Sequence, residues 1–439
     1  MEDNKGFKIN FFTLLIILMV LIAIVFMFVL FTRSSRKSRS NTIYANNTNN
    51  IEYEIKARSD NNMDKTDFAL KFLKMENNKS NMIYSPLSIK YALNMLKDGA
   101  DGNTKKQIDS LIGNEKVTKY ENIGKTLSLA NSVFIRDTFS NNVKDDYKEL
   151  LIKNYNAELK YDPFENAKEV NNWIEKQTLG QIKNMLKDNT VSNPDCKMLL
   201  INALAIDMEW EWADSFSEED THGRPFYLEN GEEVKATMMN QKNESEDVSY
   251  YVDNNITALS MNLEEYDNVQ MECVVIMPNS NLHDYINSFS IDNLDKINKN
   301  FKKASDTKAG LDISIPRFSY DYDLSLKDDL IDLGVKDAFD SSLANFSNIT
   351  DKSEVYVSDA LHKANIDFSE KGVKAAAATV IYITSGMAFQ EERESPIEIN
   401  INKPFMYIIR DKKTNEIWFV GTVYKPNLWE NDKADYEYR

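Results

Sequence analysis

The part of this chain that most restricts its possible folds lies near the carboxyl end, at residues 370–386. It joins a run of alanines to a β-branched run, and no proline occurs before Pro396. Exposed loops usually contain turn-forming residues, so this composition is unusual for a loop. Alternate residues of a strand share one face, and one face here is entirely small or apolar. Its members are Val373, Ala375, Ala377, Thr379, Ile381 and Ile383. The segment can therefore exist both as an exposed loop and as a buried strand.

The composition limits the class of protein. A chain of 439 residues is long enough for one large domain or two ordinary ones, and its hydrophobic content of 42% supports a sizeable core. The net charge of −17 argues against a nucleic-acid partner, because phosphates attract lysine and arginine. The two cysteines, Cys196 and Cys273, are far apart and predict free, buried thiols rather than a disulfide framework.

The sequence contains no set of residues arranged for catalysis or metal binding. It lacks the Gly-x-Ser-x-Gly motif of a nucleophilic serine. Of the three histidines, His222 and His283 occur in polar stretches without the spacing of metal ligands. We therefore expect a protein that is not an enzyme and that carries no metal or cofactor.

The amino end is expected to lie outside the globular fold. After a short flank at 1–10, residues 11–31 contain a single polar residue, Thr13. A helix of this length spans about 31 Å, close to the roughly 30 Å of a bilayer core. No small-residue cleavage site follows, so a retained transmembrane helix is favoured over a signal peptide. Residues 32–64 are rich in Ser, Asn and Thr and predict a polar tether.

From about residue 65 the pattern of apolar residues predicts ordered structure. Helical spacing predicts helices at 68–73, 88–96 and 170–186. Nearly continuous apolar runs predict strands buried on both faces at 196–208 and 271–277.

The later part of the chain continues with strands. Alternation at 313–318 predicts an edge strand, since Pro316 cannot donate a ladder hydrogen bond. Residues 405–409 and 417–423 predict a closing hairpin, followed by an acidic tail at 428–439. Because strands and helices do not alternate regularly, the predicted fold class is mixed α+β.

Short motifs along the chain resemble those of the serpin family, and they occur in the family's order. They are Asn81–Leu93, Gly99–Ile108, Ala130–Phe134, Asn172–Ile182, Asn202–Leu204 with Trp210 or Trp212, Met238–Met239, Ile315–Phe318, Leu333–Phe339, Phe346–Thr350, His362–Ala364, Glu370–Gly372 and Lys403–Phe405. Each motif alone is weak, but their combination in one order at plausible spacings is specific.

The resemblance implies the serpin fold for residues 65–427, with three β-sheets, about eight or nine helices and an exposed reactive-centre loop at 370–396. Serpins inhibit serine proteases as suicide substrates. The protease attacks the loop and forms an acyl-enzyme, and the cleaved loop then inserts into the main sheet as a new central strand. A loop with the composition of a strand fits this mechanism.

By the same resemblance, the loop begins with a hinge made of Glu370, Gly372, Val373, Ala375, Ala376, Ala377 and Ala378. The first residues to enter a sheet must be small and uncharged where they face the core, and glycine gives the backbone freedom to turn. The hinge sequence therefore implies an inhibitory serpin. Lys374 departs from the acid that is usual in the family, and we expect it to face solvent.

The family's spacing from Glu370 places the reactive bond between Gly386 and Met387. A slip of one residue gives Ser385 as the alternative. These residues suit a serine protease with a small or apolar specificity pocket, either elastase-like or subtilisin-like.

The resemblance also implies a polar latch beneath the main sheet, made of Ser85, Ser88, Asn202 and His362. Buried polar groups need hydrogen-bond partners, so an inserting strand would rearrange such a cluster. The ordinary interpretation of His362 is a histidine that is simply buried in the core, and the role that the resemblance implies is also a buried one.

Other interpretations stay open. The chain could be a non-inhibitory serpin that acts as a membrane-tethered binding module, or an inhibitor of cysteine proteases. We expect a monomer. The basic residues after the transmembrane helix, Arg33 to Arg39, favour a cytoplasmic domain by the positive-inside rule. Control of proteases at a cell surface favours an extracellular domain, and on this ground we expect the extracellular location.

Overall fold

The structure of the protein is a computed structural model that describes residues 68–113, 117–212, 216–352, 355–373 and 395–430. The chain divides into two compact units, Met1–Asn61 and Asn62–Arg439, and every described residue belongs to the second. The predicted transmembrane helix at 11–31 and tether at 32–64 lie outside the described residues. Within the described ranges, no helix is both long and apolar enough to cross a membrane.

Residues 68–75 are helical and form the amino-terminal helix of the described region. Eight further α-helices lie wholly within the described ranges: α3 (Pro86–Gly99), α4 (Gly102–Ile112), α5 (Asp145–Tyr155), α6 (Lys168–Gln177), α7 (Asp188–Ser192), α8 (Leu282–Ser288), α9 (Ile291–Asn300) and α10 (Leu326–Asp332). Three short 3-10 helices are η1 (Asp137–Asn142), η2 (Ala304–Asp306) and η3 (Asp337–Phe339). The mixture of these helices with many strands agrees with the predicted α+β class.

The largest sheet has seven strands and forms one wall of the main core. Its order is β1 (Met82–Tyr84), β18 (Ile417–Val423), β17 (Phe405–Asp411), β10 (Met271–Pro278), β9 (Ile256–Asn262), β8 (Val248–Val252) and β11 (Lys302–Lys303). The predicted strand at 271–277 and the closing hairpin are both present, and the residues of β10, β17 and β18 are all buried.

A second sheet has four strands, in the order β16 (Ile397–Asn400), β12 (Leu311–Pro316), β7 (Glu233–Asn243) and β6 (His222–Tyr227). The prediction of an edge strand at 313–318 is wrong, because β12 pairs with β16 on one side and β7 on the other. Its residues Ile313 and Ile315 are fully buried. Alternation in the sequence reports which face is buried and not whether both neighbours are present.

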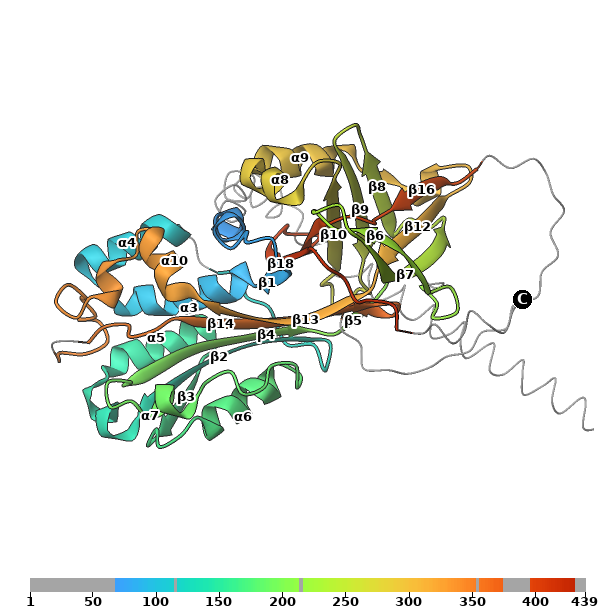
Figure 1. The fold of residues 1–439 in the computed structure, drawn as a ribbon. Helices are drawn as coiled ribbons and strands as arrows, with labels where there is room; N and C mark the ends of the chain where they lie inside the picture. The colour runs from blue at the N-terminus through green and yellow to red at the C-terminus, as the bar shows by residue number, and fades with distance from the viewer. Residues whose placement is uncertain (1–67, 114–116, 213–215, 353–354, 374–394, 431–439) are drawn as a thin grey trace, which may run out of the picture. The chain divides into compact units, whose positions relative to one another are not determined.

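The remaining strands form two sheets that run beside each other (Figure 1). One has the order β13 (Phe318–Ser325), β14 (Leu361–Ser369), β15 (Gly372–Val373) and β5 (Met208–Glu209), and the other has the order β3 (Glu158–Asp162), β2 (Leu127–Arg136) and β4 (Met198–Ile206). The sequence predicts three sheets, whereas the described residues form four. The extra sheet arises because no ladder joins β14 to β4 in the described part of the chain.

Strand β4 is covered on its two faces by different helices, α3 and α6 (Figure 1). Leu204 and Ile206 face the main core, and Ile201 and Ala203 face a second core under α6. The expected burial on both faces is therefore present in this part of the strand. The helix predicted at 170–186 is too long, since α6 ends at Gln177. Leu179 and Gly180 have φ of 55° and 77°, a left-handed conformation that ends a helix.

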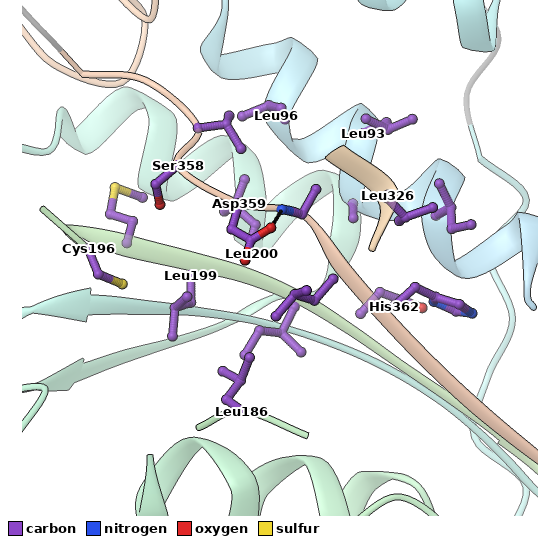
Figure 2. Close-up of a pocket in the computed structure, with 18 of the residues that line it drawn as sticks. Leu93, Leu96, Leu186, Cys196, Leu199, Leu200, Leu326, Ser358, Asp359 and His362 are labelled. Atoms are coloured by element: carbon purple, nitrogen blue, oxygen red, sulfur yellow. Dashed lines mark hydrogen bonds between the residues drawn. The ribbon is translucent and has the colours of Figure 1, made fainter. Parts of the chain in front are cut away.

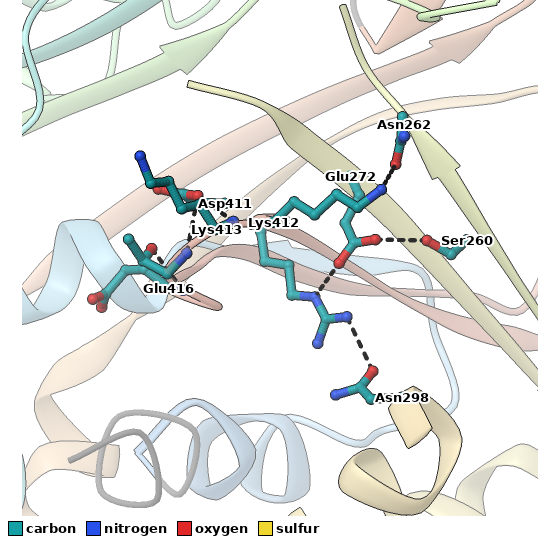
Figure 3. A network of polar contacts seen from close by, with 10 residues as sticks. Ser260, Asn262, Glu272, Asn298, Asp411, Lys412, Lys413 and Glu416 are labelled. Atoms are coloured by element: carbon teal, nitrogen blue, oxygen red, sulfur yellow. Dashed lines mark hydrogen bonds and ion pairs between the residues drawn. The ribbon is translucent and has the colours of Figure 1, made fainter. Parts of the chain in front are cut away.

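A buried ion pair joins two strands of the seven-stranded sheet, β17 and β10 (Figure 3). Arg410 Nε donates to Glu272 Oε1 over 2.7 Å, and both side chains are more than nine-tenths buried. Ser260 donates to the other carboxylate oxygen, and the Arg410 guanidinium also donates to Asn298 on α9. These partners satisfy the buried charges, which would otherwise destabilise the sheet.

Candidate functional site

The short strand β15 closes one end of the space between β14 and β4. Val373 pairs antiparallel with Phe368 of β14 and with Met208 of β5. Strand β5 follows β4 directly, so β4 and β14 run in the same direction. We call the space between β4 and β14 the gap. A strand that entered the gap after β15 would be antiparallel to both neighbours.

Gly372 can make this contact only because it has no side chain. Its φ is +151°, a conformation that L side chains rarely adopt, and an added Cβ would lie 2.1 Å from the carbonyl oxygen of Met208. Val373 follows with 2% of its surface exposed, and its side chain belongs to the main core. The first hinge residues are therefore already paired within a sheet.

The side chain of Glu370 is buried beside this strand, with 4% of the residue exposed. Thr221 Oγ1 donates to its Oε1 over 2.9 Å, and Arg317 Nη1 lies 3.7 Å from its Oε2. The carboxylate thus has a hydrogen-bond donor and a partly exposed cation as partners. Sequence analysis identified Glu370 but missed its partner Thr221, which lies 149 residues away.

Two stacked tryptophans cover the same end of the gap, which explains why the sequence left their assignment open. Trp210 Nε1 donates to the carbonyl oxygen of Ser369 over 3.1 Å, and its backbone amide donates to that of Lys371 over 3.1 Å, so this residue contacts the hinge. Trp212 stacks on Trp210 at 5.3 Å between ring centroids and donates to Gln241. Both rings are buried, and the contact with the hinge belongs to Trp210.

The gap between β4 and β14 contains a cavity of ≈ 640 Å³ (Figure 2). Strands β4 and β14 contribute Leu199, Leu200 and His362, α3 contributes Leu93 and Leu96, and α10 contributes Leu326. Cys196 also lines it, as a free and buried thiol. An apolar space between two strands that lack a ladder is suited to accept a further strand, because ladder partners are available on both sides.

Three members of the predicted latch lie together at this cavity. The Ser85 amide donates to His362 Nε2 over 3.0 Å, and Ser85 Oγ accepts from the Ser88 amide over 3.0 Å. The second bond is the N-cap of α3, where Pro86 occupies the first turn. Burial lowers the pKa of His362 from its ordinary value to about 4, so the imidazole is neutral at pH 7.

Asn202, the fourth predicted member, lines the same cavity but bonds elsewhere. Its Nδ2 donates to Asn131 Oδ1 across the β2–β4 pair, over 2.9 Å. Its Oδ1 is buried and accepts no hydrogen bond from any described residue. An unpartnered buried oxygen is costly, and it marks the place where an incoming donor would be stabilised.

The rest of the predicted site lies outside the described residues. This holds for Ala375, Ala376, Ala377 and Ala378 of the hinge and for Ser385, Gly386 and Met387 at the reactive bond. The described residues hold no group of three or more His, Cys, Asp or Glu side chains arranged for a metal ion.

Taken together, a split sheet, a gap that none of the described residues fills and a hinge strand at one end define a fold that can accept one more strand. A family model described as Serpin (serine protease inhibitor) matches residues 63–426. The chain therefore belongs to the serpin family.

Curated relatives and a solved structure agree with this assignment. The chain is 29% identical over 371 residues to an uncharacterised serpin-like protein of Methanosarcina mazei, covering 80% of this chain and 83% of that one. It is also 29% identical over 376 residues to the leukocyte elastase inhibitor of Xenopus tropicalis, covering 80% and 95%. The crystal structure of the thermophilic serpin tengpin in its native state aligns with a TM-score of 0.69 at 27% identity, covering 83% of this chain and 94% of that one.

Proposed function

We propose that this chain is an inhibitory serpin that traps a serine protease by inserting its cleaved loop into the gap between β4 and β14. The observation that carries the proposal is the position of β15, which pairs with both neighbours at the end of a gap that no other described strand enters. The loop would need only to continue along the strands that its hinge has joined.

The register of β15 supports this continuation. Val373 lies opposite Phe368 and Met208, so each further residue moves one position back along β14 and β4. Continued without a bulge, this register would place Ala375 opposite Ile366 and Ile206. These neighbours are buried, and alanine is small enough to fit between them.

Further along, the same register would bring polar groups together. Thr379 would lie opposite His362 on one side and Asn202 on the other. Its side chain would have the parity of Val373 and face the core. A hydroxyl there would reach the position of the unpartnered Asn202 Oδ1. The loop sequence and the gap therefore match at an apolar and at a polar position.

The energy of insertion is sufficient for the proposed mechanism. A strand of about a dozen residues between two partners forms on the order of 15 ladder bonds at about 0.5–1.5 kcal/mol each. Burial of its apolar face adds further stabilisation. The sum, on the order of 10 kcal/mol, equals the whole stability of a typical domain. This is enough to distort the active site of an attached protease.

We assign the reactive bond to Gly386–Met387, with Ser385 as the alternative, and expect a target with a small or apolar pocket. The names of the relatives support this choice, since several are leukocyte elastase inhibitors. The described and matched region would act as a monomer. A protease of either the elastase or the subtilisin type serves as the probe.

The test is incubation of residues 62–439 with each protease, followed by denaturing electrophoresis. A complex that survives SDS is expected, with Ala377→Arg as the matched variant that is cleaved but does not trap, because Ala377 lies beyond the hinge residues that are already paired in the sheet. Cleavage without any covalent complex, together with an unchanged melting temperature after cleavage, would contradict inhibition and favour a binding role.

We also propose that residues 11–31 anchor the domain in a membrane, with the serpin domain outside the cell. The length and apolar composition of this segment support the anchor. Membrane fractionation of the full chain, compared with a chain that starts at residue 62, tests the anchor. Digestion of intact cells by added protease tests the orientation, and a protected domain would contradict it.

A further inference from the structure

A pair of carboxyl groups joins three elements beside the split sheet. Glu76 directly follows the amino-terminal helix, Asp329 lies on α10, and Tyr322 lies in β13. The Tyr322 hydroxyl donates to Glu76 Oε2 over 2.6 Å. The carboxyl group of Asp329 lies next to that of Glu76.

This contact requires a proton. Asp329 Oδ2 is buried and has no hydrogen-bond partner among the described residues. Two ionised carboxylates offer only acceptors and repel each other, whereas one proton between them supplies the missing donor.

The electrostatic surroundings favour retention of this proton. Burial, and then the neighbouring Glu76, raise the pKa of Asp329 to about 6, and Asp328 and Asp332 on the same helix raise it further. Burial and Glu76 also raise the pKa of Tyr322, so its hydroxyl stays a donor. Lys327 of α10 donates to the carbonyl oxygen of Ser358 instead.

We propose that Glu76 and Asp329 share one proton and form a pH-sensitive contact between the amino-terminal helix, β13 and α10. The contact bears on the gap because α10 also supplies Leu326 and Leu330 to the wall of the cavity. In acid the shared proton holds this wall to the amino-terminal helix. At neutral pH Asp329 loses this proton, and the repulsion between the two carboxyl groups weakens the hold.

The direction of the effect follows from proton linkage. The folded protein keeps a proton on Asp329 up to a pH of about 6, where the pKa lies, whereas the unfolded chain releases it near a pH of about 4. The contribution of the pair to stability therefore falls as the pH rises between these values and stays low above them. His362 has the opposite sign in an overlapping range, because burial lowers its pKa to about 4. Variants must therefore separate the two groups.

The experiment compares melting temperatures of the uncleaved protein at about pH 7.5 and pH 5. In Asp329→Asn the amide replaces the shared proton with a permanent donor. We expect this variant to melt several degrees above wild type at pH 7.5 and to lose that advantage at pH 5. Glu76→Gln should behave alike, and the double variant should gain no more than either single variant. Asp328→Asn, an exposed change on the same helix, controls for the removal of one negative charge and should gain less.

Three results would overturn the proposal. They are an Asp329→Asn variant that melts below wild type at pH 7.5, a gain that does not depend on pH, and additive gains in the double variant. Stabilisation of wild type by millimolar Ca²⁺ that EDTA reverses would also overturn it, since the pair would then hold a cation. None of these outcomes depends on protease trapping, so the proposal can fail while the proposed function stands.

Discussion

The Ser85 amide donates a 3.0 Å hydrogen bond to His362 Nε2, joining the start of α3 to the start of β14 across 277 residues of sequence. An amide N–H cannot donate to a protonated nitrogen, so this bond exists only while the imidazole is neutral. The attachment of α3 to β14 beside the gap therefore depends on the charge state of His362.

Acid should break this bond and lower stability. Burial lowers the pKa of His362 to about 4, while an unfolded histidine titrates near a pH of about 6.5. The unfolded chain therefore binds the proton first, and stability should fall as the pH drops from about 6.5 to about 4, by about 3 kcal/mol in total. His362→Gln removes the titrating group but keeps an acceptor for Ser85. Denaturant midpoints against pH should flatten in this variant over that range, and parallel curves for the two proteins would rule the mechanism out.

The hinge should depend on the absence of a side chain at Gly372. An alanine Cβ would lie 2.1 Å from Met208 O and 2.8 Å from Glu209 Cα, both backbone atoms. Gly334 is a matched control, because its φ of +102° is also unfavourable for alanine but nothing lies within 4 Å. Backbone strain alone costs about 1–3 kcal/mol.

We therefore expect Gly372→Ala to lower the melting temperature more than Gly334→Ala, and to release the contact between Trp210 and Ser369. A change in tryptophan emission would report that release. If both variants lower the melting temperature equally, then backbone strain, and not the close approach to β5, is the reason that residue 372 must be glycine.

Removing one partner of the ion pair between Arg410 and Glu272 should destabilise the protein, whereas replacing both partners with apolar residues should change its stability little. Both side chains are buried, at 6% and 8% exposure, so Arg410→Met would leave a carboxylate without its cation. Such a loss costs about 3–5 kcal/mol. The double change Arg410→Met with Glu272→Leu should recover most of the denaturant midpoint. A double variant as unstable as the single one would mean that Ser260 and Asn298, rather than charge, decide the stability of this network.

Several features could be predicted from sequence because they are local. The helix predicted at 88–96, the buried run at 271–277 and the closing hairpin follow from patterns within a few residues, and α3, β10 and the β17–β18 pair contain them. The resemblance to the family then pointed to Glu370 in the loop hinge and to His362 in the polar latch.

Other features could not be predicted, because they depend on distant partners. The parallel pairing of β16 with β12 made an interior strand of an expected edge strand. Thr221 donates to Glu370 and Tyr322 donates to Glu76 across separations of 149 and 246 residues, and no periodic pattern in the sequence indicates either contact. The end of α6 depends on left-handed Leu179 and Gly180, while the apolar spacing continues past them. Sequence periodicity describes one element at a time, and these contacts join several.

The proposed register makes a last prediction at Thr379. In the inserted strand its hydroxyl would supply the donor that Asn202 Oδ1 lacks in the uncleaved protein. Thr379→Val keeps the shape and removes the hydroxyl, which should cost the cleaved form about 1 kcal/mol and leave the uncleaved form unchanged. Thr384→Val is the control, because its parity would turn it to the opposite face of the sheet. The measurement is the melting temperature of each variant before and after cleavage. If Thr379→Val and Thr384→Val both leave the melting temperature of the cleaved form unchanged, the register is wrong even though insertion occurs. If cleavage stabilises no variant, including wild type, then insertion itself does not take place.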